Sequence, residues 1–382
     1  MNLHAISEKK KASAFPGSLA LCICLMVASP ALWADDTNSY TRHNLVSDGF
    51  VQADYTDPNL KNPWGLVFNP RSDVWLSDTG TGVSTLYNGS GNPESLVVKI
   101  PGGSPTGIVY NHSSGFVVSA GGASGPSSFI FATEHGRISG WNYDVDSANA
   151  VTMVDNAQKN RAVYKGLAIV DAGGAAPMLY ATDFHNGRID VFDKDFHAVR
   201  LSSSQFADPS LPAQFAPFGI QNIDGDLYVT YAKQDAAKHD DVHGSGLGFV
   251  DVYSPSGELK RRLISGGYLN APWGLAKAPA DFGKFSNSLL VANFGDGTIN
   301  AYNIADGKFQ GQLMTAKHRP LVIKGLWGIG FGNGQPNQPT NALFFAAGPD
   351  HEKHGVYGRI EAAMHPQAGG QAPWTGGSSG YY

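Results

Sequence analysis

Apolar and polar residues alternate along residues 179–193, LYATDFHNGRIDVFD, and the alternation breaks once, at HNG (185–187). A period of two residues is typical of a strand with one buried face, and Asn-Gly between two such runs is typical of a tight turn. The pattern therefore predicts an antiparallel hairpin. Asp183 ends the first strand, where it could either cap the turn or bind a ligand.

This hairpin pattern occurs six times, each time after a short strand that contains a glycine. The other hairpins span 74–87, 129–141, 227–233 with 248–253, 289–302, and 343–348 with 355–362. The glycines that mark the preceding strands, called marker glycines below, are Gly65, Gly107, Gly166, Gly219, Gly274 and Gly328. Six repeats of a four-stranded unit predict an all-β fold, a six-bladed β-propeller.

Strand signals near both ends of the repeats predict how the ring closes. Blades one and five carry an outer strand, at 94–100 and 308–314, but no outer strand follows the last hairpin. A lone strand at 42–48 precedes the first marker glycine. We expect this strand to complete the last blade, because closure removes exposed sheet edges. One domain would then span 42–362, after a linker at 35–41 and before a Gly/Pro/Ser-rich tail at 363–382 that we expect to be disordered.

The first 34 residues have the pattern of a secretory signal peptide. Three lysines at 9–11 precede the apolar run LALCICLMV, and small residues offer cleavage after Ala31 or Ala34. We therefore expect export to the periplasm or the extracellular space, with no membrane insertion after cleavage. Both cysteines lie in this segment, and its removal changes the net charge from −5 to −7. The acidic balance argues against nucleic acid as a partner.

The repeat unit ATDFHNGRIDVF resembles an NHL repeat. Over residues 42–362 the chain is also similar to an uncharacterised bacterial family of secreted six-bladed propellers, through NLVSDG, NPWGL, TGIVYN, FIFATEHGRISGWN, YATDF, FAPFGIQ, APWGLA, LLVANFGDG and LWGIGFG. The resemblance implies the fold and no particular activity. More distant NHL-like propellers include lactonases, an amidating lyase and binding scaffolds, and the fold does not choose among them.

Two rings of side chains are expected to meet at the propeller axis. The first ring immediately precedes the marker glycines: Trp64, Thr106, Lys165, Phe218, Trp273 and Trp327. The second ring ends the second strands: Asp78, Glu134, Asp183, Tyr231, Asn293 and Ala347. The aromatic members and Tyr231 could line a ligand pocket, or they could pack blade against blade. Lys165 could form an anion site or pair with nearby carboxylates.

Glu134, Asp183, Asn293 and Asp78 are candidate metal ligands, because converging carboxylates repel unless a cation lies among them. Oxygen ligands without a thiolate suit Ca²⁺ or another hard divalent ion, and regucalcin-like propellers hold such an ion on their axis. The alternative for each residue is a local cap, whose oxygen accepts backbone N–H groups of the following turn. No nucleotide, haem or flavin cofactor is expected, since the corresponding glycine motifs are absent.

Two long loops, 232–246 and 348–355, add acidic and histidine residues on the same face and could form a lid. His135 and His185 are weak candidates for acid–base catalysis, with Asp78 as a further base. The sequence contains no recognisable nucleophile–base pair. We therefore favour a scaffold that binds a small molecule or a protein on the axial face. The alternative is a metal-assisted hydrolase or lyase acting on a lactone or ester.

Overall fold

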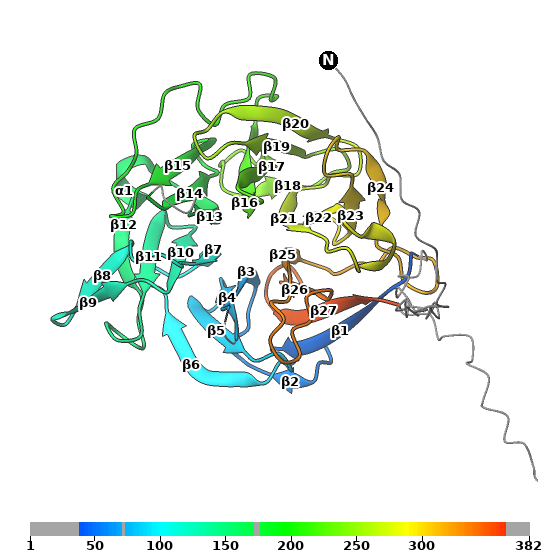
Figure 1. Cartoon of the computed structure of the whole chain (residues 1–382), viewed down its shortest axis with the longest axis horizontal. Coiled ribbons are helices and arrows are strands. Elements are labelled where there is room, and N and C mark those ends of the chain that lie inside the picture. The colour runs from blue at the N-terminus through cyan, green and yellow to red at the C-terminus, as the bar shows by residue number, and fades with distance from the viewer. Residues whose placement is uncertain (1–37, 71–72, 172–175, 364–382) are drawn as a thin grey trace, which may run out of the picture. The chain divides into compact units, whose positions relative to one another are not determined.

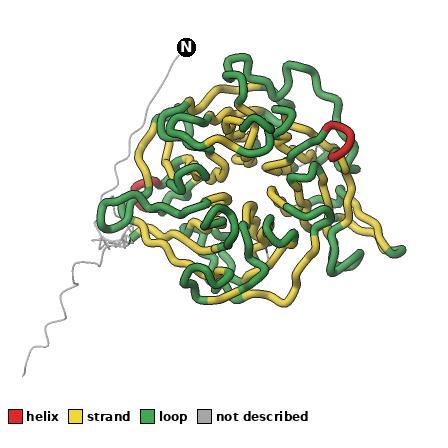
Figure 2. The backbone as a smooth tube through the Cα atoms, turned by 180° about the vertical axis from the view of Figure 1, so that it is seen from behind, coloured by secondary structure: helices red, strands yellow, loops and turns green. Residues whose placement is uncertain are grey.

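The computed structural model describes residues 38–70, 73–171 and 176–363. Six small sheets are arranged radially around a central axis in this part of the chain, and strands and loops make up nearly all of it (Figures 1 and 2). The predicted six-bladed propeller is confirmed. The expected signal peptide, residues 35–37 of the expected linker and residues 364–382 of the expected tail lie outside the described residues. No helix in the described ranges has the length and apolar character needed to cross a membrane.

Each blade begins with the strand nearest the axis and runs outward along the chain (Figure 1). The first blade consists of β3 (Pro63–Phe68), β4 (Val74–Asp78), β5 (Val83–Tyr87) and β6 (Pro93–Lys99). The second consists of β7 (Pro105–Tyr110), β10 (Phe129–Thr133), β11 (Arg137–Trp141) and β12 (Val151–Asp155). The third consists of β13 (Tyr164–Val170), β14 (Met178–Asp183) and β15 (Arg188–Phe192). The next two are β16 (Phe215–Ile223), β17 (Asp226–Gln234), β19 (Phe249–Tyr253) and β20 (Leu259–Ser265); and β21 (Pro272–Lys277), β22 (Leu289–Asn293), β23 (Ile299–Tyr302) and β24 (Phe309–Gln312). The sixth is β25 (Leu326–Phe331), β26 (Leu343–Ala347) and β27 (Val356–Ala362), joined by β1 (Tyr40–Ser47) and β2 (Tyr55–Thr56).

The sixth blade closes the ring as the sequence predicts. Strand β1 pairs antiparallel with β27, from Tyr40 opposite Ala362 to Ser47 opposite Val356. The strand begins two residues earlier than expected, because Tyr40 is buried and its hydroxyl donates to the carbonyl of Phe282 in the fifth blade at 3.0 Å. The first strand thus joins the last hairpin and also contacts its neighbour.

Three blades depart from the predicted four strands, the sixth through the short strand β2, and the second blade carries an insertion. The third sheet has three strands, and its outer edge is met only by a single bridge between Phe192 and Ala198. In the fourth blade, β18 (Asp241–Val242) pairs with β17 in the loop before β19. The second blade carries an added hairpin, β8 (Val117–Ala120) with β9 (Ala123–Pro126), which the small residues of that stretch did not indicate.

The marker glycines lie where the inner strands of neighbouring blades approach most closely. A Cβ on Gly65, Gly166, Gly219, Gly274 or Gly328 would meet the carbonyl oxygen of the residue before the next blade's marker glycine. A Cβ on Gly107 would instead meet the backbone of Gly166 and Leu167. Gly328 faces Trp64, so the series of contacts returns to the first blade. Glycine recurs in this strand because any side chain would push two blades apart.

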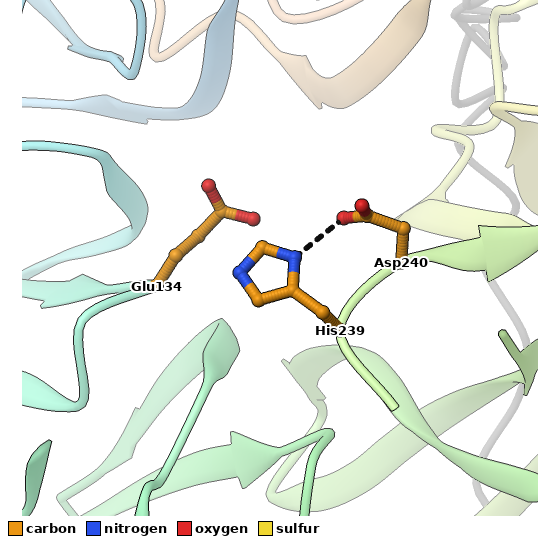
Figure 3. A group of neighbouring side chains, drawn as sticks. All are labelled: Glu134, His239 and Asp240. Carbon is orange, nitrogen blue, oxygen red and sulfur yellow. Dashed lines mark hydrogen bonds and ion pairs between the residues drawn. The ribbon is translucent and has the colours of Figure 1, made fainter. Parts of the chain in front are cut away.

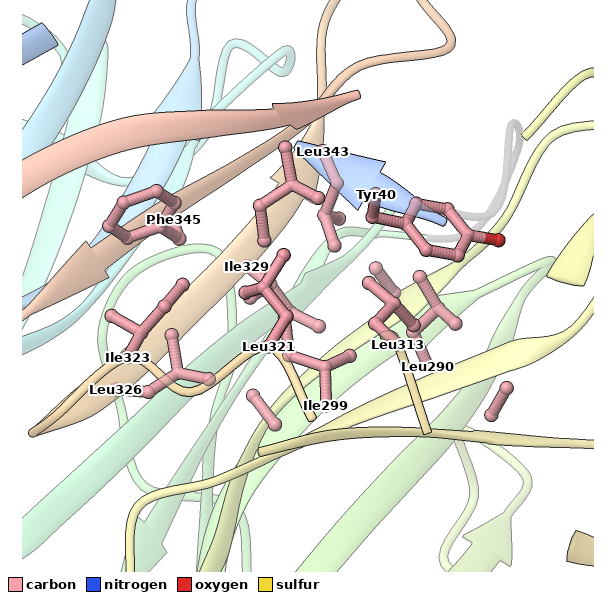
Figure 4. Packing of buried hydrophobic residues seen from close by; sticks show 14 of the residues in the cluster. Tyr40, Leu290, Ile299, Leu313, Leu321, Ile323, Leu326, Ile329, Leu343 and Phe345 are labelled. Atoms are coloured by element: carbon pink, nitrogen blue, oxygen red, sulfur yellow. The ribbon is translucent and has the colours of Figure 1, made fainter. Parts of the chain in front are cut away.

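The hydrophobic core is divided among the spaces between blades. Figure 4 shows the cluster between the fifth and sixth blades, where Ile299, Leu321 and Ile329 meet Leu343. Tyr40 of β1 lies in the same cluster (Figure 4). Closure of the ring therefore buries apolar surface as well as pairing an edge.

Candidate functional site

The aromatic residues of the first ring meet one another at the axis and fill its centre. Trp64 stacks on Trp327 with ring centroids 3.6 Å apart. Trp64 also meets Phe218, from three blades away, at 6.5 Å, and Trp273 at 6.1 Å. All four rings are buried. They form an aromatic plug, Trp64, Phe218, Trp273 and Trp327, so packing is the main role of the predicted aromatic ring.

A cavity of about 1280 Å³ lies against one side of the plug. Trp64, Trp327 and Lys165 line it, whereas Phe218 and Trp273 are not among its lining residues. Tyr231 does not line it either. Its hydroxyl lies 2.8 Å from that of Tyr253 in the core between the third and fourth blades. Half of the six predicted ligand-binding residues therefore border the cavity.

Lys165 is held between acidic groups of two neighbouring blades. Its Nζ donates to Glu134 Oε1 at 2.5 Å and to Asp240 Oδ1 at 3.4 Å, and it lies 5.0 Å from the Trp64 ring centroid. Burial by itself would lower the pKa of Lys165. The charge and hydrogen bond of Glu134, together with the charges of Asp240 and Asp241, outweigh burial and raise the pKa. Of the two sequence-based alternatives, Lys165 is a partner for carboxylates.

Two other predicted metal ligands, Asp183 and Asn293, are held by hydrogen bonds from neighbouring loops. Asp183 accepts hydrogen bonds from the backbone N–H of Val163 and from the backbone and side chain of Asn186. Asn293 accepts from the backbone N–H of Asn270, and its amide donates to the carbonyl of Tyr268. The Asn186 contacts make Asp183 a local cap, whereas Asn293 bonds to the segment that precedes β21.

Asp78 has no exposed surface. Its Oδ2 accepts a hydrogen bond from Thr85 at 2.7 Å, and its Oδ1 has no hydrogen-bond partner among the described residues. Burial raises the pKa of Asp78 well above the ordinary value, and the negative charge of Asp57 acts in the same direction. Asp78 therefore favours its protonated form, which is a poor metal ligand.

Asp78→Asn tests this assignment through pH. A carboxyl group whose pKa is raised on folding adds stability below its unfolded pKa of about 4, and that stability is lost as pH rises through the folded pKa. The amide does not titrate, so the variant should gain melting temperature relative to the parent chain between pH 5 and pH 8. Asp146→Asn is the contrast, since hydrogen bonds lower the pKa of that exposed acid. An equal loss for Asp78→Asn at every pH would contradict the assignment.

The predicted set of metal ligands therefore does not fit a divalent ion. Among the described His, Cys, Asp and Glu residues, Glu134 groups with His239 and Asp240, with ligating atoms within 4.8 Å of one another, and not with Asp78 or Asp183 (Figure 3). His239 Nδ1 lies 2.8 Å from Asp240 Oδ1. The ammonium of Lys165 contacts both acids of this group.

The loop 348–355 places a second acid in the cavity wall. Glu352 Oε2 accepts a hydrogen bond from the Asn62 amide at 2.7 Å, and Asn62 Oδ1 accepts one from the Trp327 indole at 3.0 Å. Burial raises the pKa of Glu352, partly offset by the Asn62 hydrogen bond. Asp350, His351 and Glu352 have φ of 54°, 54° and 66°. Such left-handed residues cost about 1–2 kcal/mol each, and backbone strain of this kind clusters at functional sites.

The cavity has an acidic inner part and an apolar outer part of mixed charge. Asp240, Asp241 and Glu352 lie at the inner part near Lys165. Asp241 Oδ2 lies 3.0 Å from His243 Nε2, and hydrogen bonding to this acid raises the pKa of His243.

The outer part is formed by β1 and by the connections on either side of the sixth blade. Arg42 and Lys324 line it, together with the exposed side chains of Phe50 and Val322. Phe50 stacks on the His354 ring at 4.0 Å. Exposed Asp296 and Asp350 also line the cavity and offset the charges of Arg42 and Lys324. The cavity is therefore acidic near the axis and of mixed charge toward the rim.

The two histidines predicted for acid–base catalysis do not border the cavity. His135 is exposed, and His185 lies 3.4 Å from Arg161 and 3.3 Å from the carbonyl of Lys238. Neither belongs to the lining residues.

Sequence reasoning missed several residues of the cavity. Arg42 and Phe50 come from the closing strand and the segment after it, and assigning 42–48 to the last blade could have placed them near the axial face. Phe294 follows the second strand of its blade and stacks on Trp327 at 3.8 Å. Asn62 carries no sequence signal for its role beyond its place before a marker glycine.

Comparisons with known proteins identify relatives without an assigned activity. An uncharacterised protein of Acanthamoeba polyphaga mimivirus is 33% identical over 329 residues, which cover 83% of this chain and 78% of the viral protein. A second uncharacterised protein of this virus is 33% identical over 328 residues, covering 83% of this chain and 84% of its own length. No family model matches. These relatives are viral, so the expected bacterial identity of the family is not supported.

Solved structures share the fold at low sequence identity. A structural genomics protein of unknown function from Bacteroides thetaiotaomicron has a TM-score of 0.53 and 13% identity, over 85% of this chain and 77% of that chain. A glucose dehydrogenase has a TM-score of 0.50 and 14% identity, over 85% of this chain and 100% of that chain. The expected resemblance to NHL-like six-bladed propellers holds at the level of the fold.

Proposed function

We propose that this chain is an exported propeller whose cavity binds a small amphipathic molecule carrying a positive charge. The chain belongs to the family of the uncharacterised mimivirus proteins. Because that family supplies no activity, the proposal is drawn from the cavity. The observation that carries the proposal is the cavity of about 1280 Å³ at the axis, with its acidic inner part and apolar outer part. Ligand pockets of this kind are concave and combine apolar walls with a few polar groups that set orientation.

The acidic groups at the inner end favour a cationic group there. The charge of Lys165 is matched by Glu134 and Asp240, which leaves Asp241 and Glu352 to attract a further cation. Asp241 is compensated by His243 only when that ring is protonated. Glu352 is held by a neutral amide. Charge attraction in a half-enclosed site is stronger than in open water, since screening is weaker.

The outer end supports an apolar part of the same ligand. Phe50 is 51% exposed and Val322 is 44% exposed, and both line the cavity. An alkyl or aromatic group lying across them would remove apolar surface from water, worth about 25 cal/mol per Å². The alternative function, a metal-assisted hydrolase or lyase, stays a prediction, and its candidate histidines lie away from these lining residues.

A set of three molecules with the same eight-carbon chain tests the proposal: octylamine, octanol and octanoate. The amine should raise the melting temperature in a saturable way, since a ligand that binds only the folded state stabilises it by mass action. Octanol should have a smaller effect and octanoate the smallest. Glu352→Gln should weaken the response to the amine about tenfold in apparent Kd, the loss of one partly buried charge contact.

Asp306→Asn is the matched control, because Asp306 is an acid of an exposed turn that pairs with Lys308. It should leave the response to octylamine unchanged. Equal responses to the three molecules, or a preference for octanoate, would refute the charge selectivity of the cavity.

A further inference from the structure

Acidic and histidine side chains from two blades gather around one lysine at the axis. Glu134 follows β10 in the second blade, Lys165 lies in β13 of the third, and His239 and Asp240 precede β18 in the fourth. Figure 3 shows Glu134 facing His239 and Asp240 from the opposite side of the group. We infer that the Lys165 ammonium is the resident cation of this axial site, in place of a divalent metal ion, and that it fastens the fourth blade's cavity loop to the second and third blades.

Distances support this inference first. Lys165 Nζ is 2.5 Å from Glu134 Oε1 and 3.4 Å from Asp240 Oδ1. A metal ion bound to the same two oxygens would need to lie about 2.0–2.6 Å from each. Such an ion would share the Glu134 and Asp240 oxygens with the ammonium, so the lysine and the ion would compete for the same ligands and repel each other.

Packing around the lysine supports it second. Its side chain is 2% exposed, and Nζ lies 5.0 Å from the Trp64 ring and 5.9 Å from the Phe184 ring. The Lys165 carbonyl accepts the Trp273 indole hydrogen bond at 3.1 Å. Because the aromatic plug fixes both ends of this residue, the ammonium cannot withdraw to admit an ion without disturbing the centre of the ring.

The three groups around the lysine would form a metal site once the lysine is removed. Glu134, His239 and Asp240 bring two carboxylates and one imidazole within 4.8 Å. This combination of ligands suits Zn²⁺, leaving a position for water. The chain therefore carries a latent zinc site that Lys165 keeps filled.

The test compares the wild-type chain with Lys165→Ala, both first treated with a chelator. The wild-type melting temperature should be unchanged by Zn²⁺ or Ca²⁺ at micromolar concentrations. Lys165→Ala should melt several degrees lower, because Glu134, which is largely buried, loses its partner and Asp240 loses a charge contact. Zn²⁺ should restore much of this loss and bind with one equivalent in calorimetry. Adding His239→Ala to the variant should abolish the recovery.

Lys308→Ala controls for the loss of a lysine, since Lys308 is 82% exposed and pairs with one acid, Asp306. The Lys308→Ala variant should keep the wild-type melting temperature, and Zn²⁺ should not change that temperature. One equivalent of Zn²⁺ or Ca²⁺ bound by the wild-type chain and lost on His239→Ala would overturn the inference. If Lys165→Ala folds and Zn²⁺ does not raise its melting temperature, the inference of a latent zinc site is wrong.

Glu134→Gln decides the matter if Lys165→Ala does not fold. With lysine as the resident cation, this variant should lose stability equally in chelator and in metal, because the lost contact is the ion pair. A loss seen only in metal-loaded protein would instead assign the site to a metal ion.

Discussion

A chain that begins at residue 48, and so lacks β1, is expected not to form a stable closed ring. The strand buries Tyr40, Leu45 and Val46, each 2% exposed or less. Full burial of one such side chain contributes about 1.5–3 kcal/mol, and domains are stable by about 5–15 kcal/mol in total. Deletion also leaves the edge of β27 unpaired. We expect loss of the cooperative melting transition and aggregation, measured by calorimetry and light scattering.

A chain that begins at residue 38 is the control, because it keeps all of β1 and should melt like the longer chain. Addition of a peptide spanning 38–56 should restore a transition to the shortened chain, since closure depends on pairing and burial and not on chain connectivity. A shortened chain that melts at the control temperature without the peptide would show that β1 does not close the ring.

Gly219→Ala is expected to destabilise the propeller strongly at a site far from any exposed surface. The added Cβ would overlap the carbonyl oxygen of Trp273, the backbone of the next blade, and would also approach Thr230 Oγ1 at 3.0 Å. Backbone cannot rotate away as a side chain can, so the two blades must separate. We expect a loss at the upper end of the overpacking range, about 3 kcal/mol, measured by denaturant unfolding.

Gly125→Ala is the matched control, because its Cβ would meet only the flexible side chain of Asn142 at 3.0 Å, in the added hairpin of the second blade. It should change the free energy of unfolding by less than about 0.5 kcal/mol. Comparable losses for the two variants would mean that the close approach of inner strands is not what requires glycine.

The ring and its closure could be predicted because their signals are local. Alternation with a period of two residues marks each strand, and Asn-Gly and related turns mark each hairpin, as in 179–193. The marker glycines report a contact between blades, yet each is visible in its own strand. Two features were not predicted: the added hairpin 117–126 and the absence of an outer strand in the third blade. Neither interrupts the regular spacing of the repeats.

The candidate site was predicted only in part, because a ring position does not specify what a side chain contacts. Glu134 and Asp183 occupy equivalent positions, and both were candidate metal ligands. In the structure Asp183 caps its own turn, whereas Glu134 reaches Lys165. The difference comes from neighbours: Asn186 offers amide groups to Asp183, and Lys165 offers its ammonium to Glu134.

The sequence by itself determined the number of blades, the strand that closes the ring and the glycine-marked strands that lie nearest the axis. Periodic burial, turn chemistry and repeat spacing can each be read directly from the sequence. Together they are consistent with one architecture. Only the tertiary structure decided which charges meet. Lys165 contacts Glu134 and Asp240 across separations of 31 and 75 residues. The path of the β17–β19 loop brings Asp240 to Lys165. Charge attraction depends on distance in space, so it produces no periodic pattern in the sequence from which this contact could be predicted.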